Sequence, residues 1–173
     1  GMKKFKWYYD KDAEEIWLNE MVNQGWALEH YFLGVYTFVP CEPGQYIYQI
    51  DLMPSTSAGA RDFKEFMEDS GIEVVEQWSQ WVYLRKDAQD GGFELYTDDS
   101  SRVVQYKRIR NFFTYIMIVE VIVVFLQLNA AVQTGSYIFG GTTVCFGLLL
   151  IVLLRIIWKC QWKIEELEKR RNG

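Results

Sequence analysis

The sequence predicts an α+β protein: a ferredoxin-like domain of order β-α-β-β-α-β(β), followed by a two-helix transmembrane hairpin. Three observations support this prediction. The 173 residues are 50% apolar and 17% aromatic, which excludes a disordered chain. Short aromatic strands alternate with amphipathic helices in residues 1–105, and two long apolar runs follow. Charge divides the chain at the same place, with a net of −10 in residues 1–105 and +5 in residues 106–173.

The first strand and helix are indicated by their boundary residues. Residues 3–9, KKFKWYY, are short, aromatic and strand-like. Asp10 stands at an N-cap position, acidic residues fill the next turn, and Gly25 ends the helix. A Cys-Glu-Pro-Gly turn at 41–44 then separates two strand-like stretches. The strands predicted in this part are 26–33, 34–39 and 45–52.

A second series of elements follows the first. Residues 60–70 predict a helix that ends at Gly71. The side chains that it is expected to bury are Ala60, Phe63, Phe66 and Met67. The later strands are predicted at 72–77, 81–86 and 93–97. Motifs of the two series match at spacings of 46, 45 and 47 residues: Gly25-Trp26 with Gly71-Ile72, Tyr36-x-Phe38 with Trp81-x-Tyr83, and Tyr46-x-Tyr48-x-x-Asp51 with Phe93-x-Leu95-x-x-Asp98.

Two apolar runs of 21 residues predict membrane spans, since a helix of that length covers the ~30 Å hydrocarbon core of a bilayer. Each run holds a single charged residue. The alternative is two buried helices of a soluble bundle, which would need a polar face that neither run has. The predicted divisions are a cytoplasmic domain at 1–99, a connector helix at 100–111, spans at 112–132 and 138–158, an external loop at 133–137, and a cytoplasmic helix at 159–173.

Basic residues flank the hairpin on one side. Four precede the first span between 102 and 110, five follow the second between 159 and 171, and the loop 133–137 has none. By the positive-inside rule, both termini face the cytoplasm and the chain lies in the cell membrane, with the lipid bilayer as a partner. The basic N-terminus has no apolar stretch after it and does not predict a cleavable signal.

Polar residues inside the spans are candidate site residues. Glu120 is expected ~12 Å deep, where it either fixes packing, paired with Arg155 or protonated, or forms a proton, ion or ligand site. Gln127 is expected beside Thr143, in a hydrogen bond between the two helices. A stripe of small residues on the second span lets a helix approach closely, and that helix is the first span or a second copy of the chain. Its members are Ser136, Gly140, Thr143 and Gly147.

Aromatic residues are expected to share one face of the sheet, which is a candidate binding face. If the Glu-Pro-Gly turn keeps an even register, the set comprises Tyr36, Phe38, Tyr46 and Tyr48. Helices cover one face of a ferredoxin-like sheet, so these side chains either pack in the core or form an open platform for a ligand or partner.

Catalytic, metal and cofactor motifs are not found, and no cofactor is predicted. The single histidine, His30, has no nucleophile or metal ligand at a recognisable spacing. Asp98 and Asp99 precede a helical run, so helix capping is favoured over acid–base catalysis. A domain with a net charge of −10 would repel phosphates, so no nucleic acid partner is expected.

The stretch 7–51 resembles a bacterial family of uncharacterised proteins, domain of unknown function 2812. The features that carry the resemblance are a helix ending in Gly25-Trp26, an aromatic strand, the Cys-Glu-Pro-Gly turn and a Tyr-rich strand. The later WVYLRK and ELYTDDSS fit the same pattern, and the similarity covers residues 5–105. The resemblance implies this fold and a functional neighbourhood with PadR-type transcription repressors, and it implies no catalytic residue.

These observations favour a membrane-tethered regulatory or sensory binding module. Its acidic domain would dock a cytoplasmic protein partner, which the charge predicts to be basic, with a PadR-like regulator as one candidate. One alternative is a membrane-bound enzyme acting on a lipid or amphiphile through His30, Asp51, Asp98 and Asp99. The other is a small transport or resistance subunit that depends on Glu120.

Overall fold

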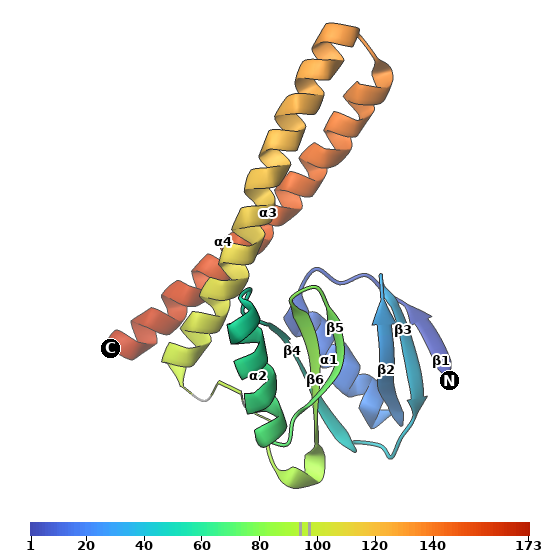
Figure 1. Ribbon diagram of the computed structural model, residues 1–173, viewed down its shortest axis with the longest axis vertical. Helices are drawn as coiled ribbons and strands as arrows, with labels where there is room; N and C mark the ends of the chain where they lie inside the picture. Colours follow the sequence, from blue (N-terminus) through green and yellow to red (C-terminus); the bar gives the residue numbers. More distant parts are fainter. Residues whose placement is uncertain (94, 97) are drawn as a thin grey trace. The chain divides into compact units, whose positions relative to one another are not determined.

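The computed structural model describes residues 1–93, 95–96 and 98–173, and the chain forms two compact units, Gly1–Leu95 and Tyr96–Gly173 (Figure 1). The first unit is α+β and the second is a hairpin of two long apolar helices. The predicted fold class is therefore confirmed.

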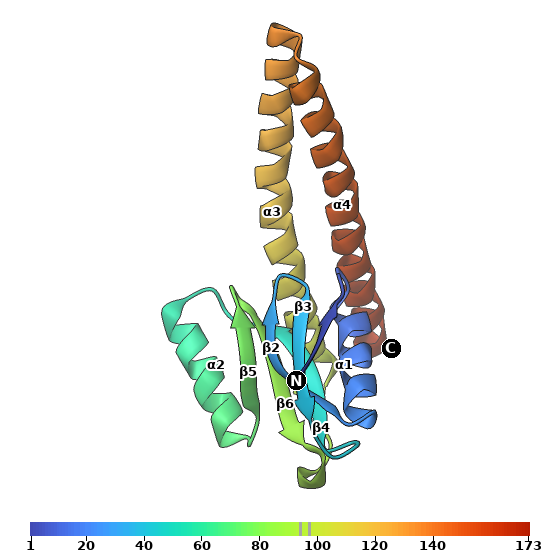
Figure 2. The same cartoon turned by 90° about the vertical axis from the view of Figure 1, so that its right-hand side faces the viewer.

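The first unit contains two three-stranded antiparallel sheets, ordered β1-β3-β2 and β4-β6-β5 (Figures 1 and 2). Strands β2 and β5 lie side by side where the two sheets meet. The elements are β1 (Met2–Phe5), α1 (Lys11–Asn23), β2 (Trp26–Phe32), β3 (Val35–Pro40), β4 (Tyr46–Leu52), α2 (Ser57–Asp69), β5 (Glu73–Trp78), β6 (Trp81–Asp87) and the short helix η1 (Ala88–Asp90).

The two halves of this unit repeat the same β-α-β-β order with a constant offset of 46 residues. Asp10 and Thr56 are the N-caps of α1 and α2, and each side chain accepts a hydrogen bond from the backbone. Gly25 and Gly71 follow the two helices with φ angles of 85° and 70°, which favour glycine. Strands β2 and β5 carry irregularities between 28 and 30 and between 74 and 76, again 46 residues apart. An internal repeat is thus present in the fold, but the predicted match between Tyr46-x-Tyr48-x-x-Asp51 and Phe93-x-Leu95-x-x-Asp98 is wrong, because β4 is the counterpart of β1.

The predicted match between Tyr36-x-Phe38 and Trp81-x-Tyr83 is wrong by one residue, because the offset of 46 aligns the first pair with Val82 and Leu84. A one-residue shift moves a side chain to the other face of a sheet. Tyr83 accordingly points to the face opposite Val82 and Leu84, and packs with the core around α1.

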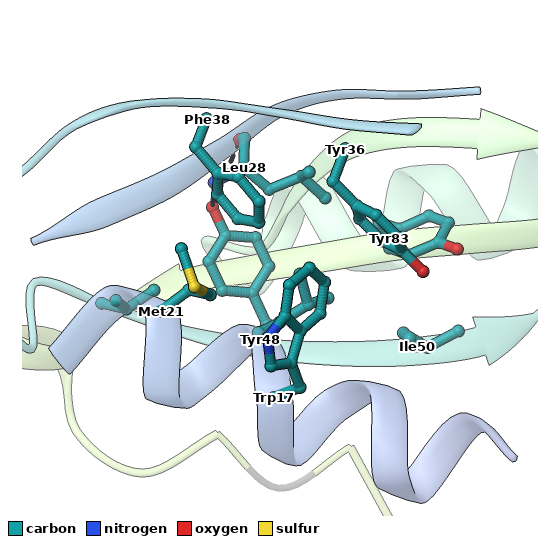
Figure 3. Close-up of a cluster of buried hydrophobic side chains, with 10 residues drawn as sticks. Trp17, Met21, Leu28, Tyr36, Phe38, Tyr48, Ile50 and Tyr83 are labelled. Atoms are coloured by element: carbon teal, nitrogen blue, oxygen red, sulfur yellow. Dashed lines mark hydrogen bonds between the residues drawn. The ribbon is translucent and has the colours of Figure 1, made fainter. Parts of the chain in front are cut away.

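Helix α1 packs against both sheets, and its core is built largely from aromatic rings (Figure 3). Trp17 contacts Tyr36 and Phe38 edge-on, at ring-centroid distances of 4.8 and 5.6 Å. Tyr48 and Ile50 enter the same core from β4. Such pairs add about 0.5–1.5 kcal/mol each beyond the burial of their area.

Helix α2 covers the other face of the β4-β6-β5 sheet, where Met67 packs with Val82 and Leu84. Ala60 and Phe63 join this second core, as predicted. Phe66 does not: it is 57% exposed, because its position lies off the stripe formed by residues 60, 63 and 67.

Strand β4 begins a second sheet instead of completing the first, so the strands are divided between two sheets. An extra strand was predicted at 93–97. Phe93, Leu95 and Tyr96 are not in a strand, and residues 94 and 97 lie outside the described residues.

The second unit consists of α3 (Asp99–Thr134) and α4 (Tyr137–Asn172), joined at Gly135, whose φ is 61°. Both helices are long and apolar enough to cross a membrane, with mean hydropathies of 2.1 and 2.3 in their most apolar windows. Each helix is continuous, so the predicted connector at 100–111 and the span at 112–132 belong to one helix. Lys107 pairs with Glu168 at 3.1 Å, and Arg110 donates to Gln161 at 2.9 Å.

Candidate functional site

The predicted aromatic binding face is enclosed in the core of the first unit (Figure 3). Tyr36, Phe38 and Tyr48 are at most 1% exposed, and Tyr46 is half-buried. The predicted shared sheet face is wrong, because Tyr36 and Phe38 lie on β3 whereas Tyr46 and Tyr48 lie on β4, which belongs to the other sheet. The rings of Tyr36, Phe38 and Tyr48 nevertheless meet in one core, where they pack against α1. Core packing, rather than an open platform, is what these residues form.

A buried carboxylate lies among these rings. Glu14 Oε1 accepts hydrogen bonds from the hydroxyl of Tyr36 at 2.5 Å and from that of Tyr83 at 2.7 Å. Burial raises the pKa of Glu14, although the two hydroxyl donors act against this rise. Burial, together with the adjacent carboxylate, raises the pKa of both tyrosines. Because all three side chains are less than 8% exposed, the cluster is a satisfied internal network.

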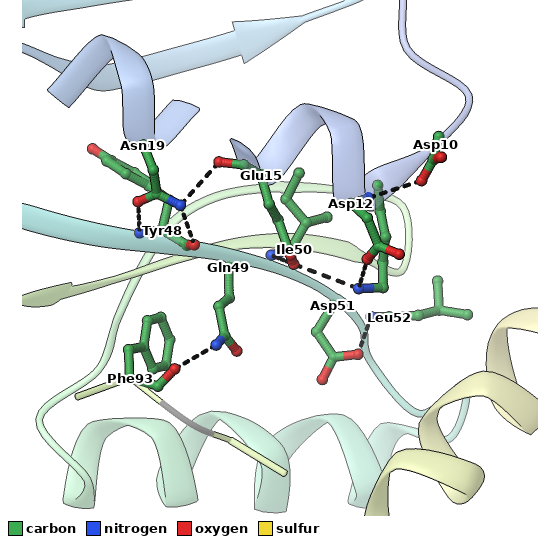
Figure 4. A network of polar contacts seen from close by, with 11 residues as sticks. Asp10, Asp12, Glu15, Asn19, Tyr48, Gln49, Ile50, Asp51, Leu52 and Phe93 are labelled. Atoms are coloured by element: carbon green, nitrogen blue, oxygen red, sulfur yellow. Dashed lines mark hydrogen bonds and ion pairs between the residues drawn. The ribbon is translucent and has the colours of Figure 1, made fainter. Parts of the chain in front are cut away.

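Polar side chains of α1 also replace the missing strand neighbour of β4 (Figure 4). Asn19 accepts from the backbone N–H of Tyr48 at 2.8 Å and donates to its carbonyl at 3.1 Å. Glu15 accepts from the backbone N–H of Ile50 at 2.7 Å. Burial raises the pKa of Glu15 to about 7, against the opposing charge of Lys11. This edge of the sheet is therefore capped within the chain and is not open to an added strand.

The histidine joins the two halves of the first unit. His30 Nδ1 lies 2.5 Å from Glu76 Oε2, and the same oxygen accepts from the backbone N–H of Tyr31 at 3.3 Å. His30 and Glu76 are 46 residues apart, so equivalent positions of the repeat meet where β2 and β5 lie side by side. This contact accounts for His30 structurally.

The other candidate acids have different partners. Asp51 is fully buried and accepts from the backbone N–H of Leu52 at 2.7 Å (Figure 4). Asp98 is the N-cap residue of α3 and accepts from the hydroxyl of Ser101, and Asp99 is the first residue of that helix. Within the described part of the chain, no three His, Cys, Asp or Glu side chains are grouped so as to hold a metal ion.

An acidic surface with an aromatic centre lies on the outer side of α2. We define the α2 surface as Asp62, Glu65, Phe66 and Asp69, which are all exposed. Their spacing of three, four and seven residues places them on one stripe of the helix. Sequence reasoning missed this surface because it assigned Phe66 to the core; the helical angle between Phe66 and Met67 was the signal that could have found it.

A second exposed surface lies on the β1-β3-β2 sheet, on the face opposite α1. We define the sheet patch as Phe5, Trp7, Phe32, Leu33 and Val35. Their exposed fractions run from 36% at Val35 to 72% at Trp7. Large apolar side chains grouped in this way mark an interaction surface more often than scattered ones do. The two surfaces together are the candidate functional sites of this unit.

In the hairpin, the expected polar pairs do not form. Glu120 is 8% exposed, and its Oε1 accepts no hydrogen bond from the described residues. Arg155 is exposed on α4. Gln127 Oε1 is also buried without a donor, while the hydroxyl of Thr143 donates to the carbonyl of Phe139 in its own helix. The two side chains do not pair because they lie on different faces of their helices: Glu120 is buried inside the hairpin, and Arg155 points away from it.

The small-residue stripe of α4 is half-buried along its length, at Ser136, Gly140, Thr143 and Gly147. A methyl group added at Gly140 or Gly147 would meet nothing within 4 Å. Close packing inside this hairpin therefore does not require glycine at either position. A second copy of the chain as the partner of the stripe stays a prediction.

Comparison with known proteins identifies the family to which the chain belongs. The sequence model described as "Protein of unknown function (DUF2812)" matches residues 10–118, more than half of the chain. The match runs from the N-cap of α1 into the apolar part of α3. No curated protein and no solved structure shows significant similarity to the chain.

Proposed function

Since this chain belongs to the DUF2812 family of proteins of unknown function, its role must be argued from its own surfaces, and we propose that it is a membrane-anchored binding module. In this proposal the hairpin spans the cell membrane with both termini in the cytoplasm. The α2 surface docks a basic cytoplasmic protein. Through this contact the module regulates that protein or senses its presence.

Burial supports the membrane anchor. Only 6% of the most apolar window of α3, and of α4, is buried within the chain. A core helix of a soluble protein buries most of such a stretch, whereas lipid solvates it without cost. Basic residues at the open end of the hairpin and none in its loop support cytoplasmic termini.

The α2 surface is the single observation that carries the docking proposal. Phe66 presents an exposed aromatic ring, and Asp62, Glu65 and Asp69 surround it with negative charge. Aromatic anchors encircled by polar residues are typical of interface hot spots. Carboxylates around the ring favour a basic partner and raise its rate of encounter. A PadR-type repressor is the first candidate, on the family resemblance.

The experiment measures binding of a purified PadR-type repressor, taken from the same genome, to the full chain in lipid nanodiscs. We expect binding that weakens with salt, and a loss of about tenfold or more for Phe66→Ser. Ile16→Ser is the matched control, because Ile16 is 62% exposed on α1, away from the α2 surface. Absence of binding, or equal losses for both variants, would contradict docking at α2.

A further inference from the structure

The sheet patch is one continuous surface across three strands. Phe5 on β1 and Phe32 on β2 are both cross-strand partners of Val35 on β3. Cross-strand partners share a face of the sheet, so these three side chains are neighbours. Trp7 stacks on Phe5 at a ring-centroid distance of 6.3 Å.

The turn between β2 and β3 is shaped to hold Trp7. Gly34 has a φ of 83°, and a Cβ at that position would lie 2.6 Å from Cε3 of Trp7. The backbone N–H of Lys6 donates to the carbonyl of Gly34 at 2.9 Å, which fixes the chain leading to the ring. Trp7 is thus positioned by the fold although 72% of it is exposed.

Neither helix of this unit occupies that face. α1 packs on the opposite face, through Tyr36 and Phe38, and α2 packs on the β4-β6-β5 sheet. The repeat explains why this face is uncovered. Each helix packs on the equivalent face of its own sheet, and α1 also packs on the other face of the β4-β6-β5 sheet. Among the described residues, no helix packs on the remaining face of the β1-β3-β2 sheet, which carries the sheet patch.

Charge near the patch has the opposite sign to that of the unit. Residues 1–9 contain three lysines and no acid, and residues 31–41 contain no charged residue. Lys3 is exposed and is the cross-strand partner of Thr37, so it lies on the same face as Phe5 and Val35. Two acids lie by this sheet, Glu29 on β2 and Glu76, which is paired with His30, whereas eight acids of this unit lie on α1 and α2.

We propose that the sheet patch docks on the surface of an anionic lipid bilayer, the same leaflet to which the hairpin tethers this unit. Exposed Trp and Phe beside Lys are the residues that settle at the boundary between headgroups and acyl chains. The tether keeps the bilayer at a high effective concentration, so a small patch with few charges suffices. The acidic α2 surface is repelled by the same lipids, which orients the unit with the patch toward them. Unlike the partner docking proposed above, this contact uses no residue of α2.

The experiment measures lipid contact of two positions in the full chain. The three cysteines, Cys41, Cys145 and Cys160, are replaced by serine, and a fluorophore is attached through Leu33→Cys or, as the control, through Glu65→Cys on α2. The protein is reconstituted in nanodiscs of phosphatidylcholine with phosphatidylglycerol, carrying a nitroxide quencher near the headgroups. We expect strong quenching at position 33 and little at position 65, with the difference lost in phosphatidylcholine alone.

Variants test the two components of the surface. Trp7→Ser removes an aromatic anchor and Lys3→Glu reverses the charge, and we expect each to lower the docked fraction, the latter by roughly tenfold in the docked-to-free ratio. Ile16→Ser and Lys64→Glu are the matched controls on α1 and α2 and leave quenching unchanged. The far-ultraviolet circular dichroism and thermal unfolding of each variant establish that it folds, and a variant that does not fold is replaced by Phe32→Ser.

Three results would overturn the proposal. The first is equal quenching at the two positions. The second is quenching that does not depend on anionic lipid. The third is a fluorophore at position 33 that escapes quenching when a nanodisc holds two copies of the chain, because the sheet patch would then be covered by the second copy. None of these results bears on binding at the α2 surface, so failure of this inference is distinguishable from failure of the proposed function.

Discussion

Glu14 and Glu15 are consecutive acidic residues on α1. Their side chains have different surroundings, but the pKa of each is raised. Glu14 is held by the hydroxyls of Tyr36 and Tyr83, and Glu15 by the backbone N–H of Ile50. Burial is the largest cause of the raised pKa in both. Each therefore retains a proton more readily in the folded chain than in the unfolded one.

Glu15 makes the stability of the first unit depend on pH. Its pKa rises from 4.5 to about 7 on folding, so its contribution to stability is fully present below the unfolded pKa and is lost as the pH rises through the folded pKa. Glu15 should contribute about 2–3 kcal/mol to the fall in the free energy of unfolding between pH 5 and pH 8, and Glu15→Gln should remove this contribution. Urea unfolding of the full chain in detergent, followed by tryptophan fluorescence, measures it. Glu20→Gln, an exposed acid on the same helix, is the control, and an equal flattening by that control would contradict the assignment.

Tyr83 is expected to stabilise the core through its hydroxyl group. In Tyr83→Phe, Glu14 keeps Tyr36 as a donor but loses the bond at 2.7 Å, while the packed ring remains. Loss of one partner of a buried carboxylate should lower the free energy of unfolding by about 1–3 kcal/mol. Thermal unfolding against Tyr9→Phe, at a ring that is 60% exposed, is the measurement. Equal melting temperatures for Tyr83→Phe and the unaltered chain would show that the bond adds no stability.

At the scale of elements, α1 both fills the core and closes the edge of β4. Asn19 supplies one donor and one acceptor to the backbone of Tyr48, as a neighbouring strand would. Asn19→Ala should leave the backbone N–H and carbonyl of the buried Tyr48 without these partners and lower the free energy of unfolding by about 1–3 kcal/mol. Hydrogen exchange at the amide of Tyr48 should accelerate more than exchange at Leu84 on the central strand β6. Uniform acceleration along both strands would mean that Asn19 acts through global stability alone.

In the hairpin, Glu120 points toward α4 without a donor. An unpaired buried acid is costly in lipid, so Glu120→Leu should stabilise the association of α3 with α4 by about 1–3 kcal/mol. Unfolding of the full chain in rising fractions of sodium dodecyl sulfate, followed by energy transfer between labels on the two helices, tests this. Arg155→Leu, at an exposed position, is the control. A less stable Glu120→Leu hairpin would mean that the carboxylate is held by a ligand, proton or second chain.

Local signals predicted most of the elements, because caps and turns are coded within a few residues. Asp10 and Gly25 located α1, and the Pro-Gly turn located the start of β4. Strand pairing could not be predicted in the same way: β4 pairs with β6, at sequence separations of 29 to 41 residues, and nothing near β4 specifies that choice. Hence the single sheet was expected and two were found.

The candidate sites were harder to predict for the same reason. Tyr36 and Tyr83 lie 22 and 69 residues from Glu14, so their shared bond is visible only in the folded chain. Aromatic periodicity grouped Tyr36, Phe38 and Tyr48, which do share one core, but it placed them on one sheet face, whereas they come from two sheets. Exposure of Phe5 and Phe32 depends on which sheet face lacks a helix. Exposure of Phe66 depends on its angle around α2, which takes it off the stripe formed by residues 60, 63 and 67.

At the scale of the whole molecule, the composition divides the chain into an acidic part and an apolar part. Residues 1–105 are acidic and carry the folded α+β unit, whereas α3 and α4 expose apolar side chains along most of their length. The family match spans this boundary, reaching residue 118. In the proposed function the hairpin holds the binding surfaces at a membrane, which would raise the rate at which the module meets other membrane-bound or recruited proteins.

Residence of the hairpin in lipid is the central claim, and carbonate extraction tests it most directly. Membranes from cells that express the full chain are washed at alkaline pH, which strips peripheral proteins, and are then sedimented without detergent. The account predicts that the chain stays in the pellet and enters the supernatant only when detergent is added. Release of the chain by carbonate alone would contradict it.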